Sequence, residues 1–420
     1  MSRMRRGGAV LGAAVLFCLM LVLPALPLGG PSGPAATPET AAPAATPAPA
    51  ASPAPTPADA KEYRAVWVSY LEWQGVDFSS RDAFAADVGE MLDNIAGLGA
   101  NVVLAHVRPF GDALYPSTLY PFSHLCTGTQ GQDPGFDPLA VLVQAAHDRG
   151  LELEAWINPY RLQSGGTPSA LADTSPANTH PDWVKTVEGG LYLDPANPEV
   201  QAYIAAGIEE LCQNYAIDGV HFDDYFYPTT AAAFDADDYA AYCEGGGSLA
   251  LEDWRRENVD ALVSLCCQAA HKYGVRFGIA PQGDPNSNYN SQYSDTARWL
   301  REAGFVDYLM PQLYWGLDYK KDGDASHSLT ALASQWLALE RREDVALYFG
   351  LGAYRIGEGD GGDRSGPGTE WQSGGALAAQ ADELARRGGQ GIGLYRYDSL
   401  FKNTLWPTLA AQEAEALRER

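Results

Sequence analysis

Two adjacent carboxylates close a short apolar segment that reads Ile217-Asp-Gly-Val-His-Phe-Asp-Asp-Tyr-Phe-Tyr-Pro228. If the segment begins as a strand, its valine and first phenylalanine face one side, and His221 and Asp223 face the other. In a parallel barrel the apolar side would contact the helices, so we expect His221 and Asp223 to point inward, with Asp223 at the mouth. Asp224 then begins the next loop. The alternative is structural, because a lone aspartate at such a position often caps a turn or pairs with an arginine.

Glycosidic bond hydrolysis requires two carboxyl groups, one to donate a proton and one to act as nucleophile or base. We expect Asp223 to be the nucleophile or base, with Asp224 beside it. Asp112 follows an earlier strand, and we predict that it is a catalytic residue and a candidate for the acid. Asp284 and Glu154 are further candidates, although Glu154 lies within a strand and would serve equally well in an ion pair.

The other strand ends carry aromatic residues interleaved with arginine and amide side chains. This combination suits a carbohydrate, because sugar faces stack on aromatic rings and sugar hydroxyls accept paired hydrogen bonds. The predicted substrate-binding residues are Arg108, Asn158, Tyr160, Arg161, His221, Tyr225, Gln282, Gln312, Tyr314, Trp315, Tyr354 and Arg355. The alternative is that the aromatic members only cap the barrel core, with their polar atoms satisfied.

Most of the chain is strongly acidic. Three of the 28 basic residues and two of the 53 acidic residues precede residue 61, which leaves 25 basic and 51 acidic residues and a net charge of −26. A region this acidic is a poor partner for nucleic acid. Four arginines nevertheless follow strand ends, and they would either bind a substrate carboxylate or neutralise nearby aspartates. These arginines are Arg108, Arg161, Arg355 and Arg396.

Cofactor and metal motifs are missing from the sequence. It contains no CxxC pair, no glycine-rich phosphate loop and no histidine cluster with metal-ligand spacing. His106 and His221 are the only histidines on predicted strands, whereas barrel metal sites usually draw several. We therefore predict no metal and no cofactor. Cys212, Cys266 and Cys267 fall in helical patterns, where buried small side chains are expected, so we predict no essential disulfide framework.

Strand-like and helix-like patterns alternate eight times after residue 61, which is typical of a parallel sheet with crossover helices. The expected strands are 64–70, 101–107, 151–157, 217–223, 275–280, 306–313, 345–350 and 391–395. The expected helices are about 81–98, 137–149, 197–215, 251–273, 294–303, 327–340, 372–387 and 402–418. We predict an α/β fold, a (β/α)₈ TIM barrel with loops enlarged after strands two, three, four and seven. A nine-stranded doubly wound sheet is the alternative.

The N-terminal 60 residues predict export. Residues 1–28 combine three arginines with a long apolar run and are expected to be a signal peptide or an N-terminal membrane anchor. Residues 29–60 are rich in Pro, Ala and Thr and are expected to be a disordered linker, and residues 61–420 are expected to be the barrel domain. We expect a protein that is extracellular or anchored on the outer face of the cytoplasmic membrane, close to the cell wall or membrane, with a polysaccharide substrate.

At these strand ends the chain resembles the family 10 glycosyl-hydrolase-like proteins, a group of exported bacterial barrels. The matching stretches are Arg64-Ala-Val-Trp-Val, Val107-Arg-Pro-Phe-Gly-Asp-Ala-Leu-Tyr-Pro-Ser117, Ala155-Trp-Ile-Asn-Pro-Tyr-Arg161, Asp218-Gly-Val-His-Phe-Asp-Asp-Tyr-Phe-Tyr-Pro228 and Met310-Pro-Gln-Leu-Tyr-Trp315. The resemblance implies a (β/α)₈ barrel and glycosidase activity, and peptidoglycan strands stripped of peptides are a substrate known in the family. The lactyl carboxylates of that substrate would give the arginines a purpose. The His221-x-Asp223 placement is also similar to the fourth-strand Arg-x-Asp of the α-amylase family, where the aspartate is the nucleophile.

The sequence therefore favours an exported glycoside hydrolase that acts on a cell-wall or extracellular polysaccharide. One alternative is a non-catalytic, wall-tethered, carbohydrate-binding barrel. The other is a transglycosylase, which would use the same residues and would differ only in its products.

Overall fold

The computed structural model describes residues 62–364 and 369–420. The predicted signal or anchor segment and the predicted linker, residues 1–60, lie outside the described residues. Within the two described ranges, every helix is too short or too polar to cross a lipid bilayer.

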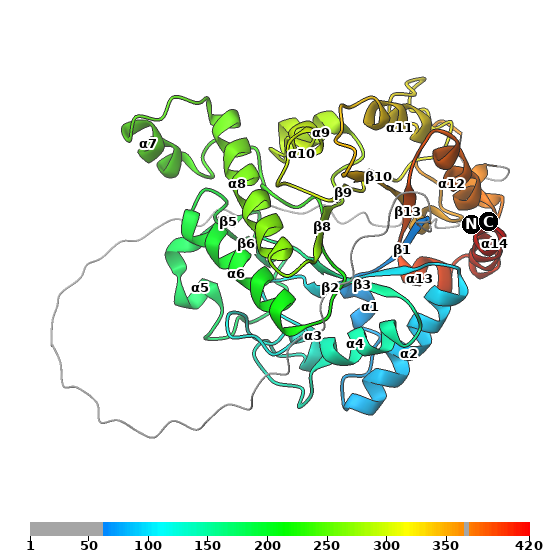
Figure 1. Ribbon diagram of the computed structural model, residues 1–420, viewed down its shortest axis with the longest axis horizontal. Helices are drawn as coiled ribbons and strands as arrows, with labels where there is room; N and C mark the ends of the chain where they lie inside the picture. Colours follow the sequence, from blue (N-terminus) through cyan, green and yellow to red (C-terminus); the bar gives the residue numbers. More distant parts are fainter. Residues whose placement is uncertain (1–61, 365–368) are drawn as a thin grey trace, which may run out of the picture. The chain divides into compact units, whose positions relative to one another are not determined.

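A curled, parallel, ten-stranded sheet forms the centre of the fold (Figure 1). Its strands are β1 (Tyr63–Val68), β2 (Val102–Arg108), β3 (Glu152–Ile157), β7 (Gly219–Phe222), β8 (Arg276–Ile279), β9 (Tyr308–Leu309), β10 (Gln312–Leu313), β11 (Ala346–Leu347), β12 (Phe349–Gly352) and β13 (Gly391–Tyr395). Hydrogen-bonded neighbours follow the order β10-β12-β13-β1-β2-β3-β7-β8-β9-β11.

All eight predicted strands are present, and two of them are interrupted. The predicted strand 306–313 is divided into β9 and β10 at Met310-Pro311, because proline has no N–H to donate to the ladder. The predicted strand 345–350 is divided into β11 and β12 at Tyr348. The doubly wound alternative is wrong, because the pairing from β13 through β1 to β9 advances along the chain without the reversal that such a sheet requires.

Helices surround the sheet (Figure 1). The eight that follow successive predicted strands are α2 (Arg81–Gly97), α4 (Pro138–His147), α6 (Pro198–Asn214), α8 (Leu251–His271), α10 (Thr296–Arg301), α11 (Leu329–Leu337), α12 (Ala376–Arg386) and α14 (Pro407–Glu419). They confirm the predicted helices to within a few residues at most ends. Several begin at capping residues that the sequence supplies, such as Asp137, whose side chain accepts a hydrogen bond from the Ala140 N–H.

The loops are enlarged where predicted, at the C-terminal ends of the strands. The loop after β3 contains a small antiparallel sheet that the sequence patterns did not reveal, with strands β4 (Arg161–Gln163), β5 (Val184–Val187) and β6 (Gly190–Leu193). The remaining short helices are α1 (Tyr70–Trp73), α3 (His124–Thr127), α5 (Pro176–Thr179), α7 (Ala236–Glu244), α9 (Pro285–Ser291) and α13 (Tyr397–Phe401), with 3₁₀ turns η1 (Pro181–Trp183), η2 (Ala353–Arg355) and η3 (Glu370–Gln372).

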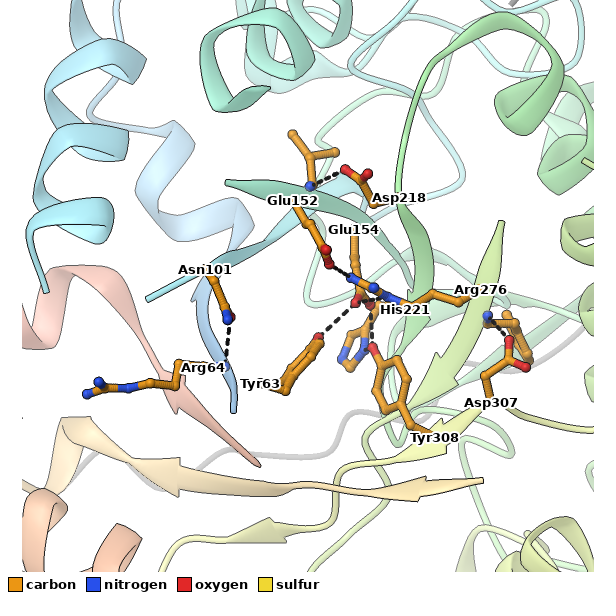
Figure 2. A network of polar contacts seen from close by, with 12 residues as sticks. Tyr63, Arg64, Asn101, Glu152, Glu154, Asp218, His221, Arg276, Asp307 and Tyr308 are labelled. Atoms are coloured by element: carbon orange, nitrogen blue, oxygen red, sulfur yellow. Dashed lines mark hydrogen bonds and ion pairs between the residues drawn. The ribbon is translucent and has the colours of Figure 1, made fainter. Parts of the chain in front are cut away.

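The two faces of the sheet bury different side chains. Val220 and Phe222 of β7 belong to the large apolar cluster between sheet and helices, as the alternation predicted. His221 points to the interior of the curl, where a polar network joins Glu154 and Tyr308 (Figure 2). Glycines make room for the large interior side chains: a Cβ at Gly278 would lie 2.0 Å from the Tyr308 ring.

A repeated device ties neighbouring strands together at their N-terminal ends. A polar residue just before one strand accepts a hydrogen bond from a backbone N–H of the predicted strand that precedes it along the chain, and Figure 2 draws three of the four cases. The pairs are Arg64 N with Asn101 Oδ1 (2.9 Å), Leu153 N with Asp218 Oδ2 (2.8 Å), Phe277 N with Asp307 Oδ2 (2.7 Å) and Leu347 N with Gln390 Oε1 (2.9 Å). This end of the sheet is therefore closed by satisfied polar contacts, which suits a stabilising role.

Candidate active site

A pocket of about 370 Å³ lies at the C-terminal ends of the strands. Its lining combines aromatic rings, two acids, one amide and one arginine. The lining residues are Trp67, Trp156, Asp223, Asp224, Tyr225, Ala280, Gln312, Tyr314, Tyr354, Tyr395 and Arg396. They come from β1, β3, β10 and β13 and from the segments that follow β7, β8, β10, β12 and β13. Most strand positions of the sheet therefore contribute to a single pocket.

Asp223 lies directly beyond the end of β7 and is only 4% exposed. Its carboxylate accepts hydrogen bonds from Trp156 Nε1 (3.2 Å), from Asn158 Nδ2 (3.2 Å) and from the Tyr225 backbone N–H (3.3 Å). Burial and the neighbouring Asp224 charge raise the pKa of Asp223 to about 7, while Arg161 opposes the shift. The site therefore fixes the orientation of a carboxyl group whose charged form is disfavoured.

Asp224 lines the same pocket with fewer protein donors. Gln312 Nε2 donates to its Oδ1 at 3.0 Å and also to the Ala280 carbonyl at 2.9 Å. Burial raises the pKa of Asp224, and contacts from the Gln312 and Gln282 side chains oppose the shift. The two neighbouring carboxyl groups disfavour each other's charge, so the pair holds a proton closer to neutral pH than an isolated aspartate does.

Arg161 is held beside this pair by aromatic rings. Its guanidinium carbon lies 4.6 Å from the centre of the Phe110 ring, 5.5 Å from Tyr70 and 5.6 Å from Tyr225, and its Nε donates to a backbone carbonyl at 3.0 Å. Tyr225 is 56% exposed, so the ring stands at the open side of the pocket. This arrangement places a fixed positive charge close enough to lower the pKa of Asp223.

Arg396 supplies the one basic side chain of the pocket lining. Its Nη1 pairs with Glu72 Oε1 at 2.5 Å, and Glu72 also accepts hydrogen bonds from the Ser69 side chain and the Asp398 N–H. The Glu72 side chain is completely buried, whereas that of Arg396 retains some exposure. Glu72 therefore positions the arginine, and this pairing across 324 residues of sequence was missed by sequence reasoning.

Tyrosine rings complete the wall near Arg396. Tyr314 stacks on Tyr395 at 5.5 Å between ring centres and meets Tyr354 edge-on at 5.6 Å. Arg355 lies behind them, with its Nε donating to the Tyr314 carbonyl at 3.3 Å. Tyr314 and Tyr354 were predicted to bind substrate and do line the pocket, whereas Arg355 does not.

Several predicted site residues lie outside the pocket lining. Asp112 is fully buried, where it accepts hydrogen bonds from His124 Nδ1 (3.0 Å) and Gln130 Nε2 (3.1 Å). Arg108 faces the helices instead of the interior, with its guanidinium 4.2 Å from the centre of the Tyr120 ring. Tyr160 is buried in the apolar cluster between sheet and helices. The structure therefore does not bring these three side chains to the acids of the pocket.

Other candidates take supporting positions. Asn158 holds Asp223, and Gln282 lies beside Asp224, although neither lines the pocket. Trp315 packs near Tyr319 and His327, also outside the lining.

The two alternative acids have structural partners. Glu154 is buried and pairs with Arg276 at 2.7 Å, as its position within a strand suggested. Asp284 caps α9 by accepting hydrogen bonds from the Asn286 N–H and the Ser287 hydroxyl. Neither carboxyl group lines the pocket.

The two strand histidines lie behind the pocket wall. His221 is fully buried and bonds to Trp67 and Tyr308, and His106 stacks on Trp156 at 3.7 Å between ring centres. His221 therefore contacts a residue of the lining, Trp67, instead of the cavity itself. Within the described part of the chain, no group of three or more His, Cys, Asp and Glu side chains is placed to hold a metal ion.

Sequence reasoning missed Trp67 and Trp156 because large aromatics within apolar strands look like ordinary core residues. The alternation along β1 carries the signal, since Tyr63, Ala65 and Trp67 all belong to the interior cluster. An inward-facing tryptophan near the C-terminal end of a barrel-like strand is expected to reach the pocket.

The glycosyl hydrolase-like 10 family model matches residues 62–364 of this chain. The glycosyl hydrolase YngK of Bacillus subtilis is 37% identical over 319 residues, which are 70% of this chain and 61% of YngK. The glycosyl hydrolase DigH of Escherichia coli K12 is 34% identical over 339 residues, which are 72% of this chain and 76% of DigH. The matched part thus spans less than two thirds of the length of YngK.

Solved structures share the architecture at low sequence identity. The PgaB (BpsB) glycoside hydrolase domain from Bordetella bronchiseptica superposes with a TM-score of 0.55 and 14% identity, covering 85% of this chain and 98% of that domain. The catalytic domain of β-amylase from Paenibacillus polymyxa gives a TM-score of 0.53 and 13% identity, covering 85% and 97%. These likenesses show a TIM-barrel-like fold. The family match and the relatives above 30% identity show that the chain belongs to the glycosyl hydrolase-like 10 family.

Proposed function

We propose that this protein is an exported glycoside hydrolase that cleaves a cell-wall or extracellular polysaccharide with the Asp223 and Asp224 pair. The observation that carries the proposal is the pair itself, two adjacent carboxyl groups with raised pKa values in an aromatic pocket. Family membership and the glycosyl hydrolase relatives support a glycosidase-like enzyme. Export is proposed from the arginines and apolar run of residues 1–28.

The scaffold that we infer is a closed (β/α)₈ barrel. Two pairings support closure: β9 pairs with β11, and β10 pairs with β12, so the sixth and seventh predicted strands adjoin along both of their halves. The eighth predicted strand, β13, pairs with β1 and joins the last unit to the first. In a closed barrel all eight C-terminal strand ends face one pocket, and the lining residues come from seven of the eight predicted strands or from the segments that follow them.

The chemistry follows from the shared proton. Near neutral pH one carboxyl group of the pair carries a proton that it can donate to the glycosidic oxygen, and the other carries a negative charge that can assist attack at the sugar carbon. Trp156, Asn158 and the Tyr225 N–H hold Asp223 in a fixed orientation for this role. The assignment of Asp223 as nucleophile or base remains a prediction.

The pocket lining also supports a substrate class. Ring faces of Trp67, Tyr314 and Tyr395 suit apolar sugar faces. Arg396 suits an acidic substituent, because Glu72 bonds only one end of its guanidinium. Peptide-free peptidoglycan strands carry both sugar rings and lactyl carboxylates, and we propose them as the substrate.

One observation favours a second candidate, a carbohydrate-binding barrel without catalysis. Among the described residues, the acids of the pocket lining are Asp223 and Asp224, neighbours at one strand end, and no described carboxyl group from another strand lines the pocket. Hydrolysis usually places its two carboxyl groups on either side of the bond that breaks. A pure binder would not need that arrangement.

Incubation with peptide-free peptidoglycan strands, followed by mass spectrometry of the products, separates the two candidates. We expect the full-length protein to release shorter glycans and Asp223→Asn to release none while still binding the strands. Asp284→Asn is the matched control, because asparagine caps a helix as well as aspartate does and Asp284 does not line the pocket. Binding without cleavage by the unmodified protein would support the non-catalytic candidate.

A further inference from the structure

A continuous chain of hydrogen bonds runs through the interior of the sheet and ends at the pocket wall. Glu154 accepts from the Tyr308 hydroxyl, the Tyr308 oxygen meets His221 Nδ1 at 2.7 Å, and His221 Nε2 meets Trp67 Nε1 at 3.2 Å. Figure 2 shows Glu154, Tyr308 and His221 side by side in this interior. Four strands, β3, β9, β7 and β1, thus contribute one residue each to a path from a buried carboxylate to a pocket-lining indole.

The chemistry of its two ends fixes the direction of every bond in this path. The Trp67 indole N–H can only donate, so His221 Nε2 must be the acceptor. His221 therefore carries its proton on Nδ1 and donates it to the Tyr308 oxygen. Tyr308 in turn donates its own proton to Glu154, which as a carboxylate can only accept. Only one tautomer of His221 satisfies all three contacts.

The far end of the path is anchored firmly. Glu154 receives Arg276 Nε at 2.7 Å and the Tyr63 hydroxyl at 2.8 Å in addition to Tyr308. Three donors to one buried carboxylate hold it in place. Burial lowers the pKa of His221 to about 3, so the ring stays neutral over the working pH range.

The near end of the path is the ring of Trp67, which is 2% exposed and lines the pocket. Two glycines across the interior leave space for the six-membered ring of this indole. A Cβ at Gly393 would lie 2.7 Å from the ring, and a Cβ at Gly350 would lie 3.0 Å from it. Tyr395, another lining residue, meets the ring edge-on at 6.0 Å. Close packing limits the position of the indole, and the bond to His221 selects which edge faces the interior.

We propose that Glu154, Tyr308 and His221 are positioning residues that hold the Trp67 indole as a wall of the sugar-binding pocket. The inference rests on the proposed function for the ligand, and it revises the prediction that His221 itself contacts substrate. The same network would otherwise be a purely stabilising feature of the core. A positioning role and a purely stabilising role differ in one respect. Only in a positioning role do the orientation and hydrogen bonding of the Trp67 indole depend on the Tyr308 hydroxyl.

Two tyrosines on the same carboxylate provide a matched comparison. Tyr308→Phe removes the hydroxyl that links Glu154 to His221, and Tyr63→Phe removes a hydroxyl from Glu154 that lies outside the path. Both tyrosines are buried, and phenylalanine keeps the ring in each case. Each variant loses one hydrogen bond to Glu154, whereas only Tyr308→Phe also loses the contact with His221.

The first measurement is the indole ¹H–¹⁵N spectrum of the full-length protein, with the Trp67 signal assigned from Trp67→Phe. We expect Tyr308→Phe to shift or broaden this signal, because His221 is then free to change tautomer, and we expect Tyr63→Phe to leave it in place. Equal changes in both variants, or no change in Tyr308→Phe, would overturn the proposal. This test involves no substrate, so it stands even if the protein cleaves no glycan.

The second measurement is binding of peptide-free peptidoglycan fragments in the Asp223→Asn background, which separates binding from cleavage. Adding Tyr308→Phe is expected to weaken binding about tenfold, the effect of a misplaced contact. Adding Tyr63→Phe should change binding less than about twofold. Equal affinities for the two would limit the network to a stabilising role.

Discussion

Two buried carboxylate sites occupy opposite ends of the same sheet and are built on opposite principles. Glu154, near the N-terminal end of β3, is surrounded by donors and paired with Arg276 at 2.7 Å. Asp223, beyond the C-terminal end of β7, forms no ion pair with any described residue, although Arg161 lies close enough to lower its pKa, and it has a second carboxyl group as its neighbour. Both are fully or almost fully buried, so burial alone does not distinguish them. Their partners distinguish them: donors and a cation hold Glu154 in the fold, whereas Asp223 and Asp224 share a proton near neutral pH.

The largest expected effect is a loss of activity on substitution of Asp223. Asp223→Asn should lower the rate of glycan cleavage by about 10³-fold, because an amide neither accepts a proton nor attacks the sugar carbon. Product formation from peptide-free glycan strands measures this loss. The folded state should survive the change, since Trp156 and Asn158 can still donate to the amide oxygen. A variant that kept more than about a tenth of the activity would remove Asp223 from the chemistry.

A change at Glu154 should lower the stability of the fold. Glu154→Gln should lower the free energy of unfolding by about 2 kcal/mol, because Arg276 loses a buried partner while keeping its exposed pairing with Glu152. Urea denaturation measures the change. Glu152→Gln removes the exposed partner of the same arginine and should cost less than about 0.5 kcal/mol. Equal losses in the two variants would contradict the contrast drawn between the two ends of the sheet.

The sequence predicted which face of the sheet most strand residues occupy. It predicted only in part which way the side chains at the strand ends point. Alternation correctly placed Val220 and Phe222 against the helices and His221 inside. The same rule fails at Arg108, because the register between β2 and β3 shifts between His106 and Arg108. A one-residue irregularity turns the next side chain to the other face. Local patterns do not reveal such a shift before strand pairing is known.

Contacts between distant segments were beyond any local pattern. Arg396 was recognised as one of four strand-end arginines, but its partner Glu72 lies in a short helix after β1 that the sequence did not suggest. Asp112 illustrates the reverse error, since its loop folds back so that His124 and Gln130 take up the carboxylate. Residues at strand ends could therefore be predicted as a group, whereas the long loops decide which of them reach the pocket.

Arg396 tests whether the pocket distinguishes acidic from neutral sugars. Arg396→Gln removes the positive charge but keeps an N–H donor for Glu72, so the buried carboxylate is not left bare. We expect binding of peptide-free peptidoglycan fragments to weaken about tenfold, the usual effect of losing a charge-assisted hydrogen bond. Fragments whose carboxyl groups have been reduced to alcohols should bind the variant and the unmodified protein equally. A tenfold loss for both fragments would assign Arg396 a structural role.

The last expected effect is a pH dependence of stability that comes from Asp223. The pKa of Asp223 is about 7 in the folded protein and near 4 when unfolded, so between these values the folded state binds more protons than the unfolded state. Its contribution to stability is present below pH 4 and is lost as pH rises through 7. Asp223→Asn has no charge to bury, so its stability relative to the unmodified protein should improve between pH 4 and pH 8. The improvement should reach at most about 4 kcal/mol, the value for a shift of about three pH units, and it should be smaller where Asp224 shares the proton. Urea denaturation of both proteins at the two pH values measures the difference, and Asp284→Asn, which alters a helix cap outside the pocket lining, provides the matched control. A relative stability of Asp223→Asn that stayed constant or fell over this range would mean that Asp223 is charged in the folded protein throughout, and the contrast between the two carboxylate sites would then rest on geometry alone.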